Sequence, residues 1–483
     1  MSRDLAELVF PEISKSTADY EEAYPRRLDS QRNEKYCVRF APSPTGFLHI
    51  GAIYTALINR LFADQKDGVF ILRIEDTDQK RSVPGAVEEI VSAFDLFDIK
   101  IDEGALSSDS SVGEYGPYFQ SRRREIYESF AKELLARGDA YPCFCSAEEL
   151  EQLRQRQMDE KSVVVGYAEA DAICRDMTVE EQIARIERGD DYIIRLRSRG
   201  THDQTRVFKD GLRGELEMPV NNQDIVIIKA DGLPTYHFAH SVDDHLMRTS
   251  HVIRADEWVS SLPIHVELFE MQGFELPEFI HLSPIMKQEG NSRRKLSKRL
   301  DPEAKASYYI EVGYPLAAVK DYLMNIANSN FEDWRQSNPD KGIDEFPFDI
   351  YKSSISGALF DFDKLVVTER EIFTSINTCC LKSFETHLRL GLLGSCCSLY
   401  VLCYDVQVFS CDCYNLLHNS NNFKLVILKI YLTLVDEAYA PPLFGSTQSL
   451  RIIRSLSFSD RQNHVPHLFS HARLPLSSCI RTY

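Results

Sequence analysis

The sequence predicts an α/β protein whose core is a parallel β-sheet, and two observations lead to this prediction. Residues 36–40 have the length and apolar character of a short buried strand, and a turn rich in Pro and Gly leads from them into a helical pattern at 48–61. A second apolar strand follows at 69–73, a spacing typical of a parallel pair with a right-handed crossover. Open sheets of this kind bind ligands at the carboxyl ends of their strands, where the acidic segment 74–78 lies.

Residues 1–35 are polar and predicted to be helical in part. Between about 121 and 220 helices predominate, which is consistent with a domain inserted into the sheet. Strand and helix then alternate again, and residues 286–370 are mostly helical after a basic loop. The elements predicted after residue 120 are helices at 122–137, 147–161, 179–188 and 262–270 and strands at 191–196, 224–228 and 251–254.

The composition is that of a soluble globular protein with more than one domain. The chain has 483 residues, of which 43% are hydrophobic and 27% charged. Its net charge of -18 argues against a protein that coats nucleic acid by bulk electrostatics. The acidic start lacks a long apolar region, and the uncharged run 390–404 is shorter than the roughly 20 residues that span a bilayer. We therefore expect no signal peptide, no membrane association and a cytoplasmic location.

The composition changes abruptly near residue 370. Nine basic and seven acidic residues give 371–483 a charge of +2, which leaves -20 on residues 1–370. Of the twelve cysteines, four precede this point and eight follow it. Two different kinds of sequence are therefore joined here.

The loop after the first strand, Pro42-Ser-Pro-Thr-Gly-Phe-Leu-His-Ile-Gly51, is a candidate phosphate cradle. A strand that enters a helix through a tight turn exposes backbone N–H groups at the positive end of the helix. His49 would add a donor, and Gly51 would allow a phosphate to approach closely. The alternative is an ordinary loop between strand and helix, with a solvent-facing His49.

A second candidate is Ser292-Arg-Arg-Lys-Leu-Ser-Lys-Arg299, which carries five basic residues in a strongly acidic chain. Lysine can act as a point charge on a leaving pyrophosphate, and the lead-in Gly290-Asn-Ser292 would let the segment close over it. A solvated basic loop is the alternative. The pyrophosphate interpretation is favoured because the loop with His49 precedes this segment, in the order that a split nucleotide-binding fold requires.

Together these segments resemble the two signature motifs of class I aminoacyl-tRNA synthetases, and the residues around them resemble glutamyl-tRNA synthetases. The resemblance covers about 36–365 and is carried by Arg39-Phe-Ala-Pro-Ser-Pro-Thr-Gly46, Leu72-Arg-Ile-Glu-Asp-Thr-Asp78, Pro234-Thr-Tyr-His-Phe-Ala239, Val242-Asp-Asp-His245 and His251-Val-Ile-Arg254. Glutaminyl-tRNA synthetases would be expected to have a Glu-Pro-Asn-Gly type of loop in place of Ser43-Pro-Thr-Gly46.

The resemblance implies a class I synthetase fold: a Rossmann-like parallel-sheet catalytic domain with an inserted acceptor-stem-binding domain and a helical stem-contact region. The implied boundaries are an N-terminal extension at 1–35, the catalytic domain at 36–120 and 221–285, the inserted domain at 121–220, the signature loop with the stem-contact domain at 286–366, and an atypical tail at 367–483.

The resemblance also implies a glutamate-binding pocket made of Arg39, Ser43, Glu75, Tyr236 and Arg254. The two guanidinium groups would hold the side-chain carboxylate with paired donors. Glu75, with Ser43 nearby, would receive the ammonium group, and Tyr236 would complete the wall of the pocket.

The implied enzyme is a glutamate–tRNA ligase that uses ATP and Mg²⁺ and acts as a monomer on tRNA(Glu), with tRNA(Gln) left open as a second substrate. It would form glutamyl-adenylate and then transfer the glutamyl group to the terminal adenosine of the tRNA. His49, Lys295 and Lys298 are the implied catalytic residues, because they would stabilise charge on the phosphates. Gly51 and Ser297 would join them in the ATP site.

Three cysteines resemble the zinc site of some glutamyl-tRNA synthetases. Cys143 and Cys145 form a tight pair, Cys174 follows later, and Tyr167 is the candidate fourth ligand. Three reduced structural cysteines are the alternative.

No resemblance extends past about residue 367. The family would next have charged helices that read the anticodon, whereas this tail is rich in Cys, Ser and Leu. A frameshift, a fusion or a wrong gene model would explain the change, and loss of the anticodon contacts would impair activity. Two other functions stay open: glutamyl transfer to a modified nucleoside in tRNA, and an inactive tRNA-binding relic.

Overall fold

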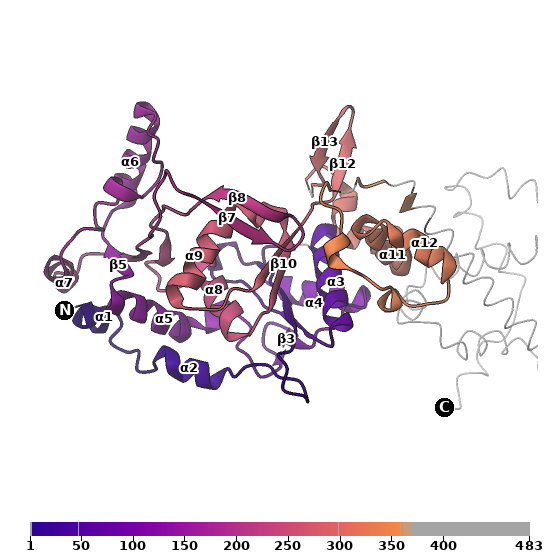
Figure 1. Ribbon diagram of the computed structural model, residues 1–483, viewed down its shortest axis with the longest axis horizontal. Coiled ribbons are helices and arrows are strands. Elements are labelled where there is room, and N and C mark those ends of the chain that lie inside the picture. The colour runs from indigo at the N-terminus through magenta and orange to yellow at the C-terminus, as the bar shows by residue number, and fades with distance from the viewer. Residues whose placement is uncertain are drawn as a thin grey trace, which may run out of the picture. The chain divides into compact units, whose positions relative to one another are not determined.

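The computed structural model describes residues 2–46, 48–297, 299–357, 359–361, 364–365 and 368 (Figure 1). Five of its strands run parallel: β1 (Cys37–Phe40) pairs with β2 (Val69–Leu72), β2 with β3 (Glu103–Ala105), and β10 (His251–Ala255) with β11 (Glu278–Leu282). A short strand β4 (Ser111–Val112) adds to β3 in the antiparallel sense. The fold is therefore of the α/β class, as predicted.

β10 lies beside β1, since the two strands are in contact and the Ser250 amide donates to the Cys37 carbonyl at 2.9 Å. β1 pairs with β2 on the side away from β10, and β10 pairs with β11 on the side away from β1. The point between β1 and β10 is thus a topological switch, where parallel sheets form ligand crevices.

Successive strand residues face two separate hydrophobic cores, as the pleat of a sheet requires. Val38 and Phe70 belong to one core, and Cys37 and Ile71 belong to the other. The first core also contains residues of α3 (Ile50–Gln65), α4 (Ala86–Leu96), α10 (Ala306–Val312), α11 (Leu316–Ala327) and α12 (Asn330–Ser337). The second contains residues of α1 (Ser2–Val9), α2 (Thr17–Ala23), α5 (Arg124–Arg137), α8 (Tyr236–Leu246) and α9 (Leu262–Gln272).

A separate antiparallel sheet lies between the two halves of the parallel one in sequence. Its strands, in order, are β5 (Ala140–Cys143), β6 (Ile193–Leu196) and β9 (Val226–Ile228). The strand predicted at 224–228 therefore pairs with β6 and not with the parallel strands. The other elements here are α6 (Ala147–Glu160), α7 (Val179–Glu187) and the hairpin of β7 (Thr205–Asp210) and β8 (Gly214–Pro219), which the sequence did not predict.

The segment predicted as a basic loop is also a hairpin, which projects from the neighbouring elements in Figure 1. It consists of β12 (Met286–Glu289) and β13 (Ser292–Lys295), and Gly290 has a φ of 59° in the turn between them. No helix in the described part of the chain is long and apolar enough to cross a membrane.

Candidate functional site

His49 joins the two segments that were predicted to bind a nucleotide. It caps the N-terminus of α3, where its Nδ1 accepts a hydrogen bond from the Gly51 amide at 2.8 Å. The proton of the ring is therefore on Nε2, which donates to the Leu296 carbonyl at 3.2 Å. A Cβ atom at Gly51 would lie 3.0 Å from Nδ1 of His49, so glycine keeps this helix end open. The loop after β1 and the segment after β13 are thus in contact.

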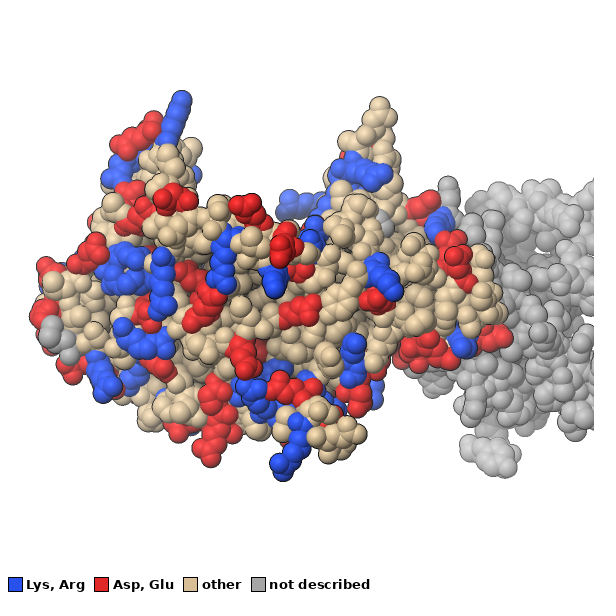
Figure 2. Space-filling model, viewed as in Figure 1, with Lys and Arg blue, Asp and Glu red and all other residues tan. Residues whose placement is uncertain are grey.

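The basic side chains around the β12–β13 hairpin, blue in Figure 2, form ion pairs with carboxylates. Lys295 pairs with Glu257, and Arg294 donates to both carboxylate oxygens of Asp301 at 2.6 and 2.8 Å. The Ser297 amide also donates to Asp301, at 2.9 Å. The hydrogen bonds from Arg294 in particular hold the pKa of the Asp301 carboxyl well below its usual range. Lys298 lies outside the described residues.

The first half of the predicted glutamate pocket comes from the carboxyl ends of β1 and β2. Arg39 is buried in β1, and its Nε lies 3.1 Å from each carboxylate oxygen of Asp244. Glu75 follows β2 and accepts a hydrogen bond from Arg73 at 3.2 Å. Burial raises the pKa of the Glu75 carboxyl to about 7, although Arg73 and Arg39 act in the opposite direction.

Ser43 lies in the loop after β1, where its side chain is exposed. The Glu75 amide donates to the carbonyl of the preceding residue, Pro42, at 3.0 Å. The end of β2 and the first loop therefore adjoin each other, as the prediction for Ser43 and Glu75 requires.

The second half of the pocket comes from α8 and β10. Tyr236 is the first residue of α8, and its ring lies 4.3 Å from that of Trp258, centroid to centroid. Arg254 of β10 is only 5% exposed. Burial raises the pKa of Tyr236 to about 12, and the charges of Glu75, Arg254 and Arg39 act on the same hydroxyl. Tyr236 is therefore within electrostatic range of the other three predicted residues.

No carboxylate among the described residues forms an ion pair with Arg254. Its Nε donates to Nε2 of His281 at 3.0 Å, and its Nη1 donates to Nδ1 of His265 at the same distance. Burial lowers the pKa of the guanidinium to about 10. A buried cation that lacks an ion-pair partner attracts an anion. Glu75, the candidate partner for a cation, acts with Arg254 on the Tyr236 hydroxyl. The site suits a molecule that carries both an ammonium group and a carboxylate.

Asp243 and Asp244 are both fully buried in α8, and their roles were not predicted from the sequence. Asp243 accepts hydrogen bonds from Arg123 and Tyr127, at 2.7 and 2.9 Å. Asp244 binds Arg39 of β1 and Arg73, which directly follows β2. The available signal was the pair of adjacent acids within the recognised motif Val242-Asp-Asp-His245. Acids become buried only when they have partners.

The three cysteines predicted to bind a metal lie close together in the structure. The sulfur atoms of Cys143, Cys145 and Cys174 all lie within 4.8 Å of one another. The Tyr167 hydroxyl is 3.4 Å from the sulfur atoms of both Cys143 and Cys145. Hydrogen bonding from Cys174 lowers the pKa of the Cys143 thiol to about 4. Three thiols and one hydroxyl around a common point fit the tetrahedral donor set that Zn²⁺ prefers.

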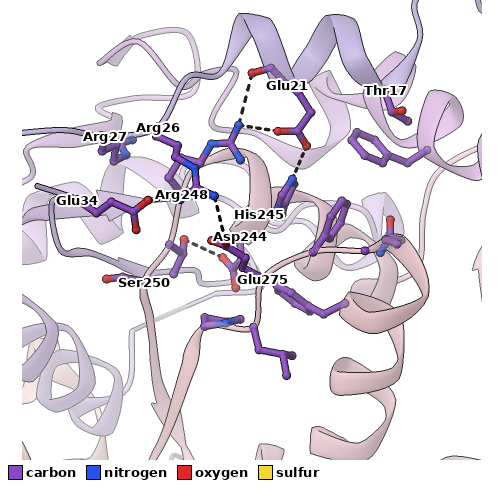
Figure 3. A pocket seen from close by; sticks show the side chains of 18 of the residues that line it. Thr17, Glu21, Arg26, Arg27, Glu34, Asp244, His245, Arg248, Ser250 and Glu275 are labelled. Atoms are coloured by element: carbon purple, nitrogen blue, oxygen red, sulfur yellow. Dashed lines mark hydrogen bonds and ion pairs between the residues drawn. The ribbon is translucent and has the colours of Figure 1, made fainter. Parts of the chain in front are cut away.

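A cavity of about 1000 Å³ lies at the opposite end of the parallel strands (Figure 3). Tyr36, Ser250 and Pro277, which precede β1, β10 and β11, are among the residues that line it. Figure 3 shows Glu21 of α2 in contact with His245 and Arg248, which holds the N-terminal extension against the end of α8. The sequence contained no signal for this cavity.

Comparison with known proteins places these features in a family. The family model for the catalytic domain of class I tRNA synthetases (E and Q) matches residues 35–353. The chain is 53% identical over 361 residues to the glutamate–tRNA ligase of Clostridium beijerinckii, which covers 75% of this chain and 65% of that protein. It is 50% identical over 375 residues to that of Acetivibrio thermocellus, which covers 77% and 68%. The chain thus spans about two thirds of the length of these relatives.

The fold is also similar to a solved structure. The crystal structure of a glutamate tRNA ligase from Elizabethkingia meningosepticum, in complex with its amino acid, superposes with a TM-score of 0.65 at 30% identity. The match covers 90% of each chain.

Proposed function

The chain belongs to the glutamyl-tRNA synthetase family of class I aminoacyl-tRNA synthetases, and from this premise we propose that it is a glutamate–tRNA ligase. The observation that carries the proposal is Arg254, a buried guanidinium that lacks a carboxylate partner among the described residues. Its charge and that of Glu75 both act on the Tyr236 hydroxyl. A side-chain carboxylate would supply the missing charge, and Glu75 would receive the ammonium group.

The reaction has two steps. The α-carboxylate of glutamate attacks the α-phosphate of ATP, which is bound as its magnesium complex, and pyrophosphate leaves. A ribose hydroxyl of the terminal adenosine of the tRNA then attacks the glutamyl carbonyl, and AMP leaves. The protein positions the reactants and stabilises charge, so no covalent enzyme intermediate is needed.

Each predicted residue has a role in this scheme. Arg39 and Arg254 bind the side-chain carboxylate, while Glu75 and Ser43 receive the ammonium group beside Tyr236. His49 is the donor to the triphosphate, for which its Nε2 would exchange its contact with the Leu296 carbonyl, and Gly51 leaves room for the phosphates. Lys295, Ser297 and Lys298 act on the pyrophosphate, for which Lys295 would exchange its contact with Glu257.

The same premise supports proposals for the partners. We propose tRNA(Glu) as the substrate, with its acceptor stem against the segment of β5, β6 and β9, and a monomer in the cytoplasm as the active form. Cys143, Cys145, Cys174 and Tyr167 would hold Zn²⁺, which would fix the fold of this segment without taking part in the reaction.

Exchange of labelled pyrophosphate into ATP tests the proposal on the full chain, with glutamate and total tRNA present. We expect exchange with glutamate, little with glutamine, and a loss of at least about 100-fold in His49→Ala, since one phosphate contact is removed. Lys298→Ala is the second control.

The product identifies the acceptor. Labelled glutamate on the 3′-terminal fragment of digested tRNA supports the ligase, whereas label on an internal fragment would support transfer to a modified nucleoside. A folded chain that shows neither exchange nor labelling would contradict the proposal and favour an inactive relic.

A further inference from the structure

Arg254 and Arg39 differ in their hydrogen-bond partners: Arg39 is bound by a carboxylate and Arg254 by two imidazoles. Arg39 contacts both carboxylate oxygens of Asp244 at 3.1 Å and is therefore paired with a charge. Arg254 donates to Nε2 of His281 and to Nδ1 of His265, both at 3.0 Å, and forms no ion pair with any carboxylate of the described residues. Its guanidinium is thus oriented by acceptors that carry no charge when their rings are neutral.

The hydrogen bonds fix where the protons of these imidazoles lie. Since the Nε of arginine is always a donor, Nε2 of His281 is the acceptor, and its proton is on Nδ1, which donates to Asp210 at 2.5 Å. Nδ1 of His265 accepts from Arg254 in the same way, so its Nε2 donates to Nδ1 of His237 at 2.9 Å. Burial lowers the pKa of both His281 and His265, which keeps both rings neutral.

Asp210 is the fixed end of this chain of contacts. It is the last residue of β7, and its Oδ1 accepts from the amides of Leu212 and Arg213 at 3.0 and 2.7 Å. Its Oδ2 accepts from the amide of His281 at 3.2 Å as well as from the ring. The β7–β8 hairpin is therefore linked to Arg254 through Asp210 and His281.

We propose that Asp210, His281 and His265 are positioning residues that make this site select a side-chain carboxylate over the corresponding amide. The inference rests on the proposed function. A carboxylate partner would satisfy Arg254 in the empty protein, and acid and amide would then bind alike. Neutral imidazoles orient the guanidinium but leave its charge to the ligand, and an amide leaves that buried charge unbalanced.

A pair of variants that match in shape and differ in charge, His281→Glu and His281→Gln, tests this in the full chain. The two side chains have nearly the same shape, and both present an oxygen acceptor, but only one brings a charge. Calorimetric titration measures the dissociation constants of glutamate and glutamine. We expect His281→Gln to keep the preference for glutamate within about tenfold of the original chain, and His281→Glu to lower it by about 100-fold or more.

We expect the affinity for ATP to be the same in both variants and the original chain, which would show that the variants fold. The pair His265→Glu and His265→Gln repeats the test from the other side of Arg254 if His281→Glu does not fold. The inference would be overturned if the preference for glutamate over glutamine changed equally in the Glu and Gln variants, or if it persisted in the Glu variant. The proposed function would stay intact in either case. An original chain that binds ATP but prefers glutamine, or binds neither amino acid, would instead overturn both.

Discussion

Glu75 lies where its own negative charge is unfavourable. Burial raises the pKa of its carboxyl to about 7, from an ordinary value of 4.5. Between these two values the folded chain keeps a proton on Glu75 that the unfolded chain has lost. The contribution of Glu75 to the free energy of unfolding therefore falls as the pH rises through this window. An ammonium group beside the carboxylate would compensate the lost stability.

We therefore expect the affinity for glutamate to increase between pH 6 and pH 8, by about tenfold, as the ionised fraction of Glu75 rises. Calorimetric titration at pH 6, 7 and 8 measures this, and protons are expected to leave the protein on binding near pH 6. Glu75→Gln is the control and should bind weakly at every pH. If Glu75→Gln showed the same pH profile as the original chain, the assignment would be wrong.

The residues proposed as direct ligands could be named from the sequence, whereas the residues that hold them could not. Arg39 and Arg254 lie inside recognisable motifs at strand ends. Asp210 and His281 are 71 residues apart, and neither lies in a motif that the sequence analysis used. Their roles arise only when β7 and β11 pack together, which no local pattern encodes.

At the scale of elements, the β12–β13 hairpin depends on one buried carboxylate. Asp301 accepts hydrogen bonds from Arg294, from the Ser297 amide and from Lys287, the last at 2.9 Å. Without it, two cations on one hairpin repel each other and the turn loses its anchor.

We expect Asp301→Ala to open this hairpin, because loss of these contacts lowers the free energy of local opening by about 1–2 kcal/mol. Trypsin cleavage after Arg293, Arg294 or Lys295 should then be about tenfold faster, and ATP with Mg²⁺ should slow it again. Glu289→Ala, which removes one exposed partner of Arg294, is the matched control and should change the rate little. Equal rates for Asp301→Ala and the original chain would contradict the prediction.

The cysteine cluster connects the end of β5 with the segment before α7. Removal of a bound metal with a chelator should therefore speed up hydrogen exchange in α6 and α7 while the parallel strands stay protected. Elemental analysis is expected to find about one zinc per chain, and less in Cys174→Ser. A chain without zinc whose exchange is unaffected by chelator would favour three structural cysteines.

Elements with a clear apolar period, such as α3 and α5, were predicted close to their observed bounds. α8 was not, because it buries His240, Asp243 and Asp244 along with its apolar residues. A helix of this composition is stable only when arginines from other elements neutralise it, so its own sequence does not show an apolar face.

At the scale of the whole molecule, α8 joins parts of the chain that are distant in sequence. Asp244 binds Arg39 of β1 and Arg73, the residue after β2. Asp243 binds Arg123 at the start of α5, at the entrance to the inserted segment. The two carboxylates thus hold the first half of the parallel sheet, the insertion and the second half together.

Asp243→Asn should accordingly lower the free energy of unfolding by about 3 kcal/mol or more, because it leaves Arg123 as a buried charge without its partner. Urea titration followed by the fluorescence of Trp258 and Trp334 measures the change. Glu151→Gln, which removes an exposed ion pair with Arg154 on α6, is the control and should cost at most about 0.5 kcal/mol. Similar losses in both variants would contradict this view of α8.

Arg254 has no carboxylate counter-ion among the residues that the structure describes, and this affects how the protein responds to buffer components. Any small carboxylate that fits the pocket can balance that charge, so acetate or formate in a buffer should behave as a competitive inhibitor and raise the apparent KM for glutamate. Acetamide, which has the same size but no charge, should have no such effect. A weakly bound organic acid carried through purification would likewise stabilise the chain against heat, and its removal by dialysis would lower the Tm.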